Sequence, residues 1–229
     1  DNEDARLRGL RSANIMDTLP EKDYDALTQL ASYICGTPIA LVSLLDEKRQ
    51  WFKSSVGLGA SETPRDISFC QHAIMGHSIF EVKNALDDPM FANNPLVTGN
   101  PDIRFYAGVP LDFGGGVNLG TLCVIDTVPR ELNEDQKSAL NLLAIQVVNL
   151  LKHRQTNVEL LKSQRTFLNF FNLSVDLVCV ANVNGTFEKV SPSFSTVLGY
   201  EISELEGVPF ADFIHPEDLQ ATLEIIEKL

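Results

Sequence analysis

The feature that most constrains the fold is a stretch from Asn133 to Phe171 that contains neither proline nor glycine. These two residues end helices most readily, so the stretch predicts one continuous helix. At about 1.5 Å per residue, such a helix is too long to be buried by one small domain. We therefore expect one folded part before the helix and another after it.

The two halves of this helix carry different apolar patterns. In the first half, Leu140, Leu143 and Ala144 are expected to pack on a sheet. Further along, apolar residues recur at alternating spacings of four and three, a seven-residue repeat that favours pairing with a second helix as a coiled coil. The predicted dimer seam comprises Val147, Leu151, Arg154, Val158, Leu161 and Leu168.

Before the helix, the sequence alternates between helical and strand patterns. Two helices are predicted on either side of "DTLPEKD". Residues 37–45 and 50–57 predict one hairpin of strands, and residues 103–113 and 118–126 predict a second, joined by "GGGV". A short helix is expected from Ser68 onward. Together these segments predict an α+β fold, an antiparallel sheet flanked by helices.

Composition and charge limit the partners. The chain has 18 basic and 31 acidic residues, a net charge of -13, which repels nucleic acid and anionic lipid. No apolar run is long enough for a membrane span, so no membrane contact is expected. The four cysteines lie far apart among apolar neighbours, which favours a reduced, cytoplasmic compartment.

After the long helix the pattern changes again. Residues 176–194, "DLVCVANVNGTFEKVSPSF", predict a hairpin of two short strands around Asn184-Gly185. Short helical pieces follow, and a last helix is expected to begin at Pro216 with acidic residues in its first turn.

Several stretches together form the pattern of a known family. They are "LRSANIMDTLPEKDYDALTQLASYICGTPIALVSLLDEKRQWFKSSVGL", "ETPRDISFCQHAI", "DDPMFANNPLVTG" and "IRFYAGVPL…GTLCVIDTVPREL". Through them, residues 5 to about 152 resemble a GAF domain of bacterial sensor kinases and diguanylate cyclases. The predicted GAF sensor domain is residues 1–152, followed by a connector helix at 153–171.

The last part of the chain carries a second resemblance. Through "DLVCVANVNGTFEKVSPSFSTVLGY" and "FADFIHPEDLQATL", it resembles the first half of a PAS domain. The family's remaining three strands would come after Leu229. Residues 172–229 are therefore expected to form an incomplete PAS fold, with a two-stranded sheet and helices or with strands exchanged with a neighbour.

These resemblances imply a sensory input region, in which a ligand or partner acts on a pocket and the long helix carries the change to an output domain. The first expectation is a two-component sensor histidine kinase acting as a homodimer. The alternatives are the input region of a diguanylate cyclase or phosphodiesterase, and a structural dimerisation module without ligand. The chain carries no ATP-binding, phosphoacceptor or cyclase signature, so catalysis is expected of the output domain in the same polypeptide.

The stretch "SFCQHAI" places Cys70 and His72 two positions apart. On a helix such positions face different ways, which argues against a shared metal ion or a nucleophile with its base. Bilin-binding relatives use a Cys-His dipeptide, which is absent here, while His72 or His77 leave haem ligation open; the sequence requires no cofactor or metal. The favoured interpretation is that this helix lines a pocket, with Cys70 as a small buried hydrophobe and His72 in the pocket or the core.

The strands supply further pocket candidates. Arg104 and Tyr106 share a face of one strand, and Thr121 and Cys123 share a face of the next. Arg104 has two readings, as the partner of an anionic ligand or of a nearby aspartate (Asp87, Asp88 or Asp126). An enzyme like the free methionine sulfoxide reductases, a GAF-like class with redox cysteines, would require two cysteine sulfurs close together at an open pocket. The predicted pocket residues are Trp51, Phe69, Cys70, His72, Arg104, Tyr106, Thr121 and Cys123.

Overall fold

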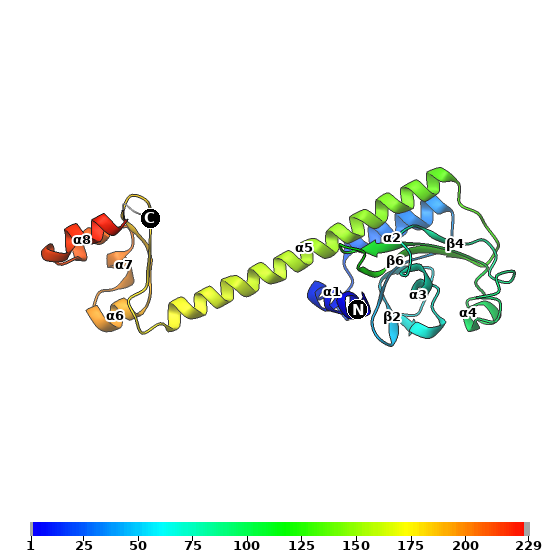
Figure 1. Cartoon of the computed structure of the whole chain (residues 1–229), viewed down its shortest axis with the longest axis horizontal. Coiled ribbons are helices and arrows are strands. Elements are labelled where there is room, and N and C mark those ends of the chain that lie inside the picture. The colour runs from blue at the N-terminus through cyan, green and yellow to red at the C-terminus, as the bar shows by residue number, and fades with distance from the viewer. Residues whose placement is uncertain (1, 227–229) are drawn as a thin grey trace. The chain divides into compact units, whose positions relative to one another are not determined.

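The computed structural model describes residues 2–226, which fall into two compact units that meet between Val158 and Glu159 (Figure 1). One helix, α5 (Glu134–Leu173), runs through this boundary and confirms the continuous helix predicted from the stretch without proline and glycine. No helix in residues 2–226 combines the length and the apolar character needed to cross a membrane.

The first unit is built on a six-stranded antiparallel sheet, which confirms the α+β class. The predicted hairpins are its central strands, whereas the edge strand β3 (Glu62–Pro64) was not predicted. The strand order is β3-β2-β1-β6-β5-β4. The strands are β1 (Ile39–Leu45), β2 (Arg49–Val56), β3 (Glu62–Pro64), β4 (Phe80–Val82), β5 (Phe105–Asp112) and β6 (Asn118–Asp126).

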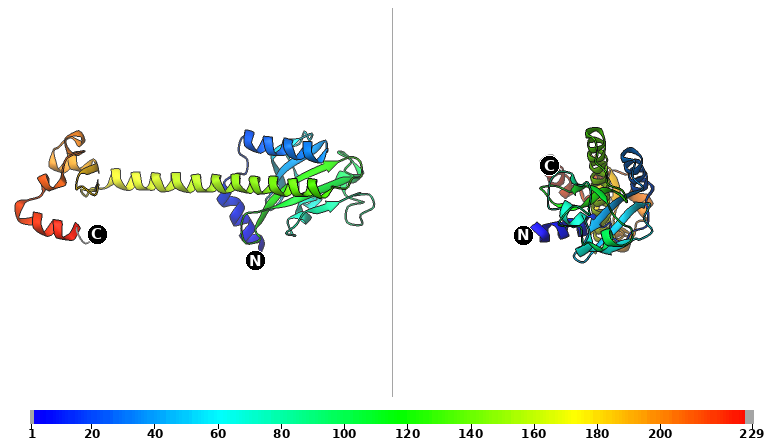
Figure 2. Two further views of the ribbon diagram at one scale, coloured as in Figure 1. Left: turned by 90° about the horizontal axis from the view of Figure 1, so that it is seen from above. Right: turned by 90° about the vertical axis from the view of Figure 1, so that its right-hand side faces the viewer.

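Helices cover both faces of this sheet. The longer helices α2 and α5 lie on one face, and the short helices α3 and α4 lie with their loops on the other (Figures 1 and 2). The helices of this unit other than α5 are α1 (Asn2–Ala13), α2 (Lys22–Cys35), the 3-10 turn η1 (Arg65–Ile67), α3 (Cys70–Ala73) and α4 (Pro95–Thr98).

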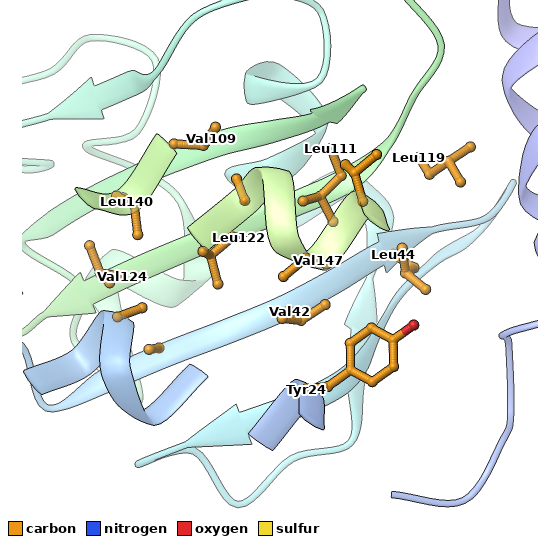
Figure 3. Packing of buried hydrophobic residues seen from close by; sticks show 14 of the residues in the cluster. Tyr24, Val42, Leu44, Val109, Leu111, Leu119, Leu122, Val124, Leu140 and Val147 are labelled. Carbon is orange, nitrogen blue, oxygen red and sulfur yellow. The ribbon is translucent and has the colours of Figure 1, made fainter. Parts of the chain in front are cut away.

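Coverage of both faces explains why the central strands are apolar without a break. Every residue of β1 and β6 is buried. The alternation of a strand sends Val42 and Leu44 to the face under α5, where they pack near Leu140 and Val147 (Figure 3). Leu41 points to the opposite face and joins a second core. The sheet therefore separates two hydrophobic cores.

The first core corrects part of the predicted dimer seam. Val147 and Leu151 are fully buried in it. Arg154 donates hydrogen bonds to the carbonyl oxygen of Asn14 at 2.9 Å and to the carboxylate of Glu21 at 3.0 Å. These three seam positions are occupied by their own domain, so assigning them to an interface with a second helix was wrong. At Val147 and Leu151 the seven-residue spacing reflects packing on the chain's own sheet.

The remaining seam positions lie further along α5. Val158 is half-buried, whereas the side chains of Leu161 and Leu168 are 65% and 47% exposed. For these residues the prediction of a seam stands as a prediction.

The second unit contains a two-stranded antiparallel sheet and short helices, with the hairpin and helical pieces where the sequence predicted them. Phe187, Val190, Phe194 and Leu205 form its small core. Assignment of this unit to the PAS fold remains a prediction. Its elements after α5 are β7 (Cys179–Ala181), β8 (Phe187–Val190), α6 (Ser193–Leu198), α7 (Ile202–Leu205), the 3-10 turn η2 (Phe210–Phe213) and α8 (Pro216–Ile226).

A glycine sets the close pairing of the two central strands. Gly120 of β6 lies opposite Leu44 of β1. A Cβ atom added to Gly120 would lie 1.9 Å from the carbonyl oxygen of Ser43. Because that oxygen belongs to the backbone of a buried strand, no side-chain rotation relieves the clash.

We expect Gly120→Ala to lower the free energy of unfolding by about 3 kcal/mol or more, at the upper end of the cost of overpacking a core. Urea denaturation followed by circular dichroism measures the change. Gly59→Ala is the matched control, since a Cβ atom at Gly59 meets no atom within 4 Å. Equal stability of the two variants would contradict this role of Gly120.

Candidate functional site

A cavity of about 420 Å³ lies on the sheet face opposite α2 and α5. Strands β1 and β2 form one wall with Leu41 and Phe52, and the segment leading into α3 contributes Phe69. The ring of Phe69 stacks on Phe91, with centroids 4.1 Å apart and planes 9° from parallel. Packed aromatic rings therefore hold this wall in place.

A second hollow, of about 540 Å³, lies between α1 and the turn after β1. Four of its charged side chains form two ion pairs: Arg49 with Asp46 at 2.8 Å, and Arg11 with Glu47 at 2.8 Å. Among the described residues, none of the buried polar atoms that lack a partner belongs to its lining. We therefore regard the smaller cavity beside β1 and β2 as the site.

Two polar side chains in the cavity lack partners. Gln50 of β2 and Thr63 of β3 lie opposite each other in the antiparallel register, and both line the cavity. Gln50 Oε1 and Thr63 Oγ1 are buried, and neither has a hydrogen-bond partner among the described residues. A buried polar atom without a partner costs free energy, so this pair is suited to a ligand that hydrogen-bonds to both.

The rest of the lining is uncharged. Among the described residues around the cavity, Ser68, Asn100 and Tyr106 add polar groups, and none is an Asp, Glu, Lys, Arg or His. An ionised ligand would lose its hydration here without an opposite charge to replace it. The cavity is therefore suited to a neutral molecule.

Cys70, the first residue of α3, is one of the lining residues and is surrounded by a cluster of polar groups. Three hydroxyl groups lie within hydrogen-bond distance of its sulfur: Thr121 Oγ1 at 3.1 Å, Ser43 Oγ at 3.3 Å and Tyr106 Oη at 3.3 Å. Cys123 Sγ lies 3.9 Å away. Strands β1, β5 and β6 thus place four donor groups around one sulfur, and Cys70 itself lines the cavity.

This environment separates the cysteines chemically. Burial raises the pKa of the Cys70 thiol, but the hydrogen bonds from Cys123, Ser43, Thr121 and Tyr106 together outweigh it and bring the pKa below its ordinary value. The hydrogen bond to Cys70, together with burial, raises the pKa of Cys123 well above its ordinary value. Of the pair, Cys70 therefore has the lower pKa.

Tyr106 reaches this cluster because position 108 is a glycine. A Cβ atom at Gly108 would lie 2.2 Å from Tyr106 Oη, so any larger residue would displace the phenol. The ring of Tyr106 also stacks on Phe69, with centroids 5.2 Å apart. The cluster around Cys70 and the aromatic wall of the cavity therefore share one side chain.

Of the predicted pocket residues, Phe69, Cys70 and Tyr106 line the cavity. Thr121 and Cys123 lie behind it in contact with Cys70, which is a hydrogen-bonded sulfur and not the purely hydrophobic filler expected from the sequence.

His72, Trp51 and Arg104 lie outside the cavity. The ring of His72 lies edge-on to Phe91. Burial lowers the pKa of His72, and the negative charge of Asp88, which favours the protonated form, only partly offsets this effect. Trp51 belongs to the core under α2, because β2 sends position 51 to one face and positions 50 and 52 to the other.

Arg104 holds a loop in place. Its guanidinium donates to the carbonyl oxygen of Val97 at 2.9 Å and pairs with Asp102 at 3.0 Å. It is not placed to bind an anion in the cavity, and the aspartate that it pairs with is none of the three proposed.

The sequence interpretation missed Gln50, Thr63 and Ser43. Positions 50 and 52 of a strand point to the same face of the sheet, so the sequence could have placed Gln50 beside Phe52. Because aromatic residues occupy both 51 and 52, however, the alternation could not tell which face holds a cavity. No group of three or more His, Cys, Asp and Glu side chains is placed to hold a metal within residues 2–226.

The family identified as "GAF domain" matches residues 20–151. A curated protein, the cyclic di-GMP phosphodiesterase PA2567 of Pseudomonas aeruginosa, is 45% identical over 130 residues, which cover 57% of this chain and 22% of that protein. The chain therefore spans less than a quarter of this relative's length.

Solved structures show the same fold. The GAF domain of an Acinetobacter phosphoenolpyruvate-protein phosphotransferase superposes with a TM-score of 0.51 and 21% identity, covering 67% of this chain and 93% of that one. The PixJ GAF domain of Thermosynechococcus elongatus, in its blue-light absorbing form, gives a TM-score of 0.51 at 14% identity, covering 70% and 96%. At these identities the likeness concerns the fold alone.

We expect Tyr106→Phe to raise the pKa of Cys70, because the thiolate loses one hydrogen-bond donor. A hydrogen bond to a charged group contributes about 1.5 to 3 kcal/mol, so alkylation of Cys70 by iodoacetamide near neutral pH should slow about tenfold. Mass spectrometry of peptides over a pH series gives the rate. Tyr33→Phe, at an exposed tyrosine of α2, is the control. An unchanged pH profile would contradict the assigned role of Tyr106.

Proposed function

Because the chain belongs to the GAF domain family through residues 20–151, which are more than half of its length, we propose that it is a sensory domain whose cavity binds a small neutral molecule. One observation carries the proposal: Gln50 and Thr63 place two unpartnered polar atoms side by side in a cavity that is otherwise lined mainly by apolar residues. A purely structural module would be expected to fill this space or pair these groups.

The two polar atoms define what the ligand must offer. Gln50 Oε1 only accepts hydrogen bonds, so the ligand needs an N–H or O–H donor there. Thr63 Oγ1 both donates and accepts, so an adjacent acceptor or donor on the ligand would satisfy it. The rings of Phe52 and Phe69 line the same space and favour a flat, largely apolar body.

The sheet offers a route from the cavity to the long helix. Leu41 of β1 faces the cavity, and its neighbours Val42 and Leu44 pack in the core that contains Leu140 and Val147 of α5. A ligand that shifts β1 must therefore shift the surface on which α5 is packed. We propose that this coupling carries the signal.

We further propose that the output is an enzyme of cyclic di-GMP metabolism. The 45% identity to the phosphodiesterase of P. aeruginosa supports this choice over the sensor histidine kinase that the sequence pattern put first. In this proposal residues 172–229 are the beginning of a PAS domain between sensor and output.

A second copy of the chain is the partner that we propose for the later part of α5. Leu160, Leu161, Phe167 and Leu168 leave apolar surface exposed over two helical turns. Exposed apolar surface on a long helix is commonly covered by another helix.

The first experiment compares native and denatured mass spectra of the purified chain. We expect the native mass to exceed that of the polypeptide by a small neutral compound, which denaturation releases. Gln50→Leu should reduce occupancy about tenfold or more through the lost hydrogen bond, with the melting temperature of the empty protein little changed. Gln29→Leu, on the exposed surface of α2, is the control. An empty wild-type cavity would argue against a resident ligand. The same native spectrum gives the number of chains in the assembly and so tests the proposed pairing with a second copy.

The output is tested by a chimera in which residues 20–151 of this chain replace the matched segment of the P. aeruginosa phosphodiesterase. We expect cyclic di-GMP hydrolysis by the chimera to change about fivefold or more on Gln50→Leu, the lower range of allosteric coupling. Gln29→Leu should leave the rate unchanged. Equal rates for all three chimeras would show that the cavity is not coupled to this output.

A further inference from the structure

The cluster around Cys70 is more than a ligand pocket requires. Most buried cysteines are inert because they lie among apolar atoms, and Cys35 shows this case: burial alone raises the pKa of its thiol to about 11. Cys70 is just as buried but sits among three hydroxyls and a second thiol. Because Cys70 also lines the cavity, a small molecule in the cavity would lie next to this residue.

We propose that Cys70 and Cys123 form a dithiol site that reduces a small neutral hydroperoxide, with Cys70 as the attacking sulfur and Cys123 as the resolving one. The two sulfurs lie 3.9 Å apart and both are buried, whereas Cys35, the other thiol of this unit, belongs to the core on the opposite face of the sheet. This site goes beyond the proposed sensing of a bound ligand and does not depend on it.

The chemistry balances in two steps. The Cys70 thiolate attacks one oxygen of ROOH; an S–O bond forms, the O–O bond breaks, two electrons pass from sulfur to the peroxide, and RO⁻ takes a proton from solvent and leaves as ROH. The sulfur of Cys123 then attacks the Cys70 sulfenic acid. The S–S bond forms, the S–O bond breaks, and hydroxide leaves as water with the proton of Cys123.

The surroundings suit both steps. Ser43, Thr121 and Tyr106 hold the attacking thiolate by hydrogen bonds, which a neutral sulfenic acid retains only weakly. Once Cys70 is neutral, Cys123 loses the neighbouring charge that raises its pKa, so it ionises more readily when it must attack. The sulfurs then have to close from 3.9 Å to about 2.05 Å.

The cavity decides which oxidant fits. No Lys, Arg or His side chain lines it among the described residues, so an anionic oxidant would lose its hydration without meeting an opposite charge. A free amino acid such as methionine sulfoxide brings both an ammonium and a carboxylate group, and the cavity offers a partner for neither. Hydrogen peroxide and small alkyl hydroperoxides are neutral and fit.

The test treats the reduced, folded chain with hydrogen peroxide, quenches it with N-ethylmaleimide in denaturant, and maps the cysteines by mass spectrometry. We expect an intramolecular Cys70–Cys123 disulfide to form at least about tenfold faster than Cys35 is oxidised, since thiolate fraction sets the rate. This comparison within one chain needs no variant. Oxidation of Cys70 at the rate of Cys35, or disulfides only between chains, would overturn the proposal.

Variants separate the two roles. Cys123→Ser should stop the reaction at a Cys70 sulfenic acid that dimedone captures, and Cys70→Ser should leave Cys123 reduced. Cys35→Ser is the matched control and should not change the rate. If Cys123 in the Cys70→Ser chain is oxidised and labelled by dimedone as fast as the wild-type chain forms its disulfide, the assignment of Cys70 as the attacking sulfur is contradicted. If circular dichroism shows that a variant does not fold, the comparison of Cys70 and Cys35 oxidation within the wild-type chain still tests the proposal.

Discussion

The pairing of β1 with β6 is the interaction on which the rest of the structure depends. The two strands lie at the centre of the sheet, every residue in them is buried, and Gly120 allows the backbones to approach closely at Ser43. Because both strands send alternate side chains to opposite faces, they contribute to both hydrophobic cores at once. One core holds α2 and α5, and the other surrounds the cavity.

This arrangement explains how polar side chains can be accommodated inside the second core. Buried hydroxyl and thiol groups are costly unless they are hydrogen-bonded. Ser43 and Thr121 face each other across the β1–β6 pair, with their oxygens 3.0 Å apart, and both reach Cys70. Gln50 Oε1 and Thr63 Oγ1, which also line the cavity, are left without partners among the described residues. The polar groups around Cys70 therefore satisfy one another, whereas Gln50 and Thr63 remain available to a ligand.

The long helix shows how one sequence pattern serves two purposes. A seven-residue apolar repeat indicates that a helix buries one face, and it does not identify what covers that face. Val147 and Leu151 are covered by the chain's own sheet, whereas Leu161 and Leu168 remain exposed. The sequence predicted the helix and its apolar face correctly because both are local properties. The point along α5 at which its own domain no longer covers the apolar face depends on how far the sheet extends.

The sequence by itself determined the α+β class, the two central hairpins, the continuous helix and the family of residues 20–151, because strand alternation, turn glycines and helix-breaking residues act over short distances. It also pointed to Phe69, Cys70 and Tyr106 at the cavity. Only the tertiary structure decided that Trp51 faces the other core, that Arg104 holds a loop, and that Gln50 and Thr63 lie unpartnered side by side. It alone brought Cys123 to Cys70 across 53 residues of chain. Such contacts depend on strand register and on which face each helix covers, and neither is encoded by spacing along the sequence.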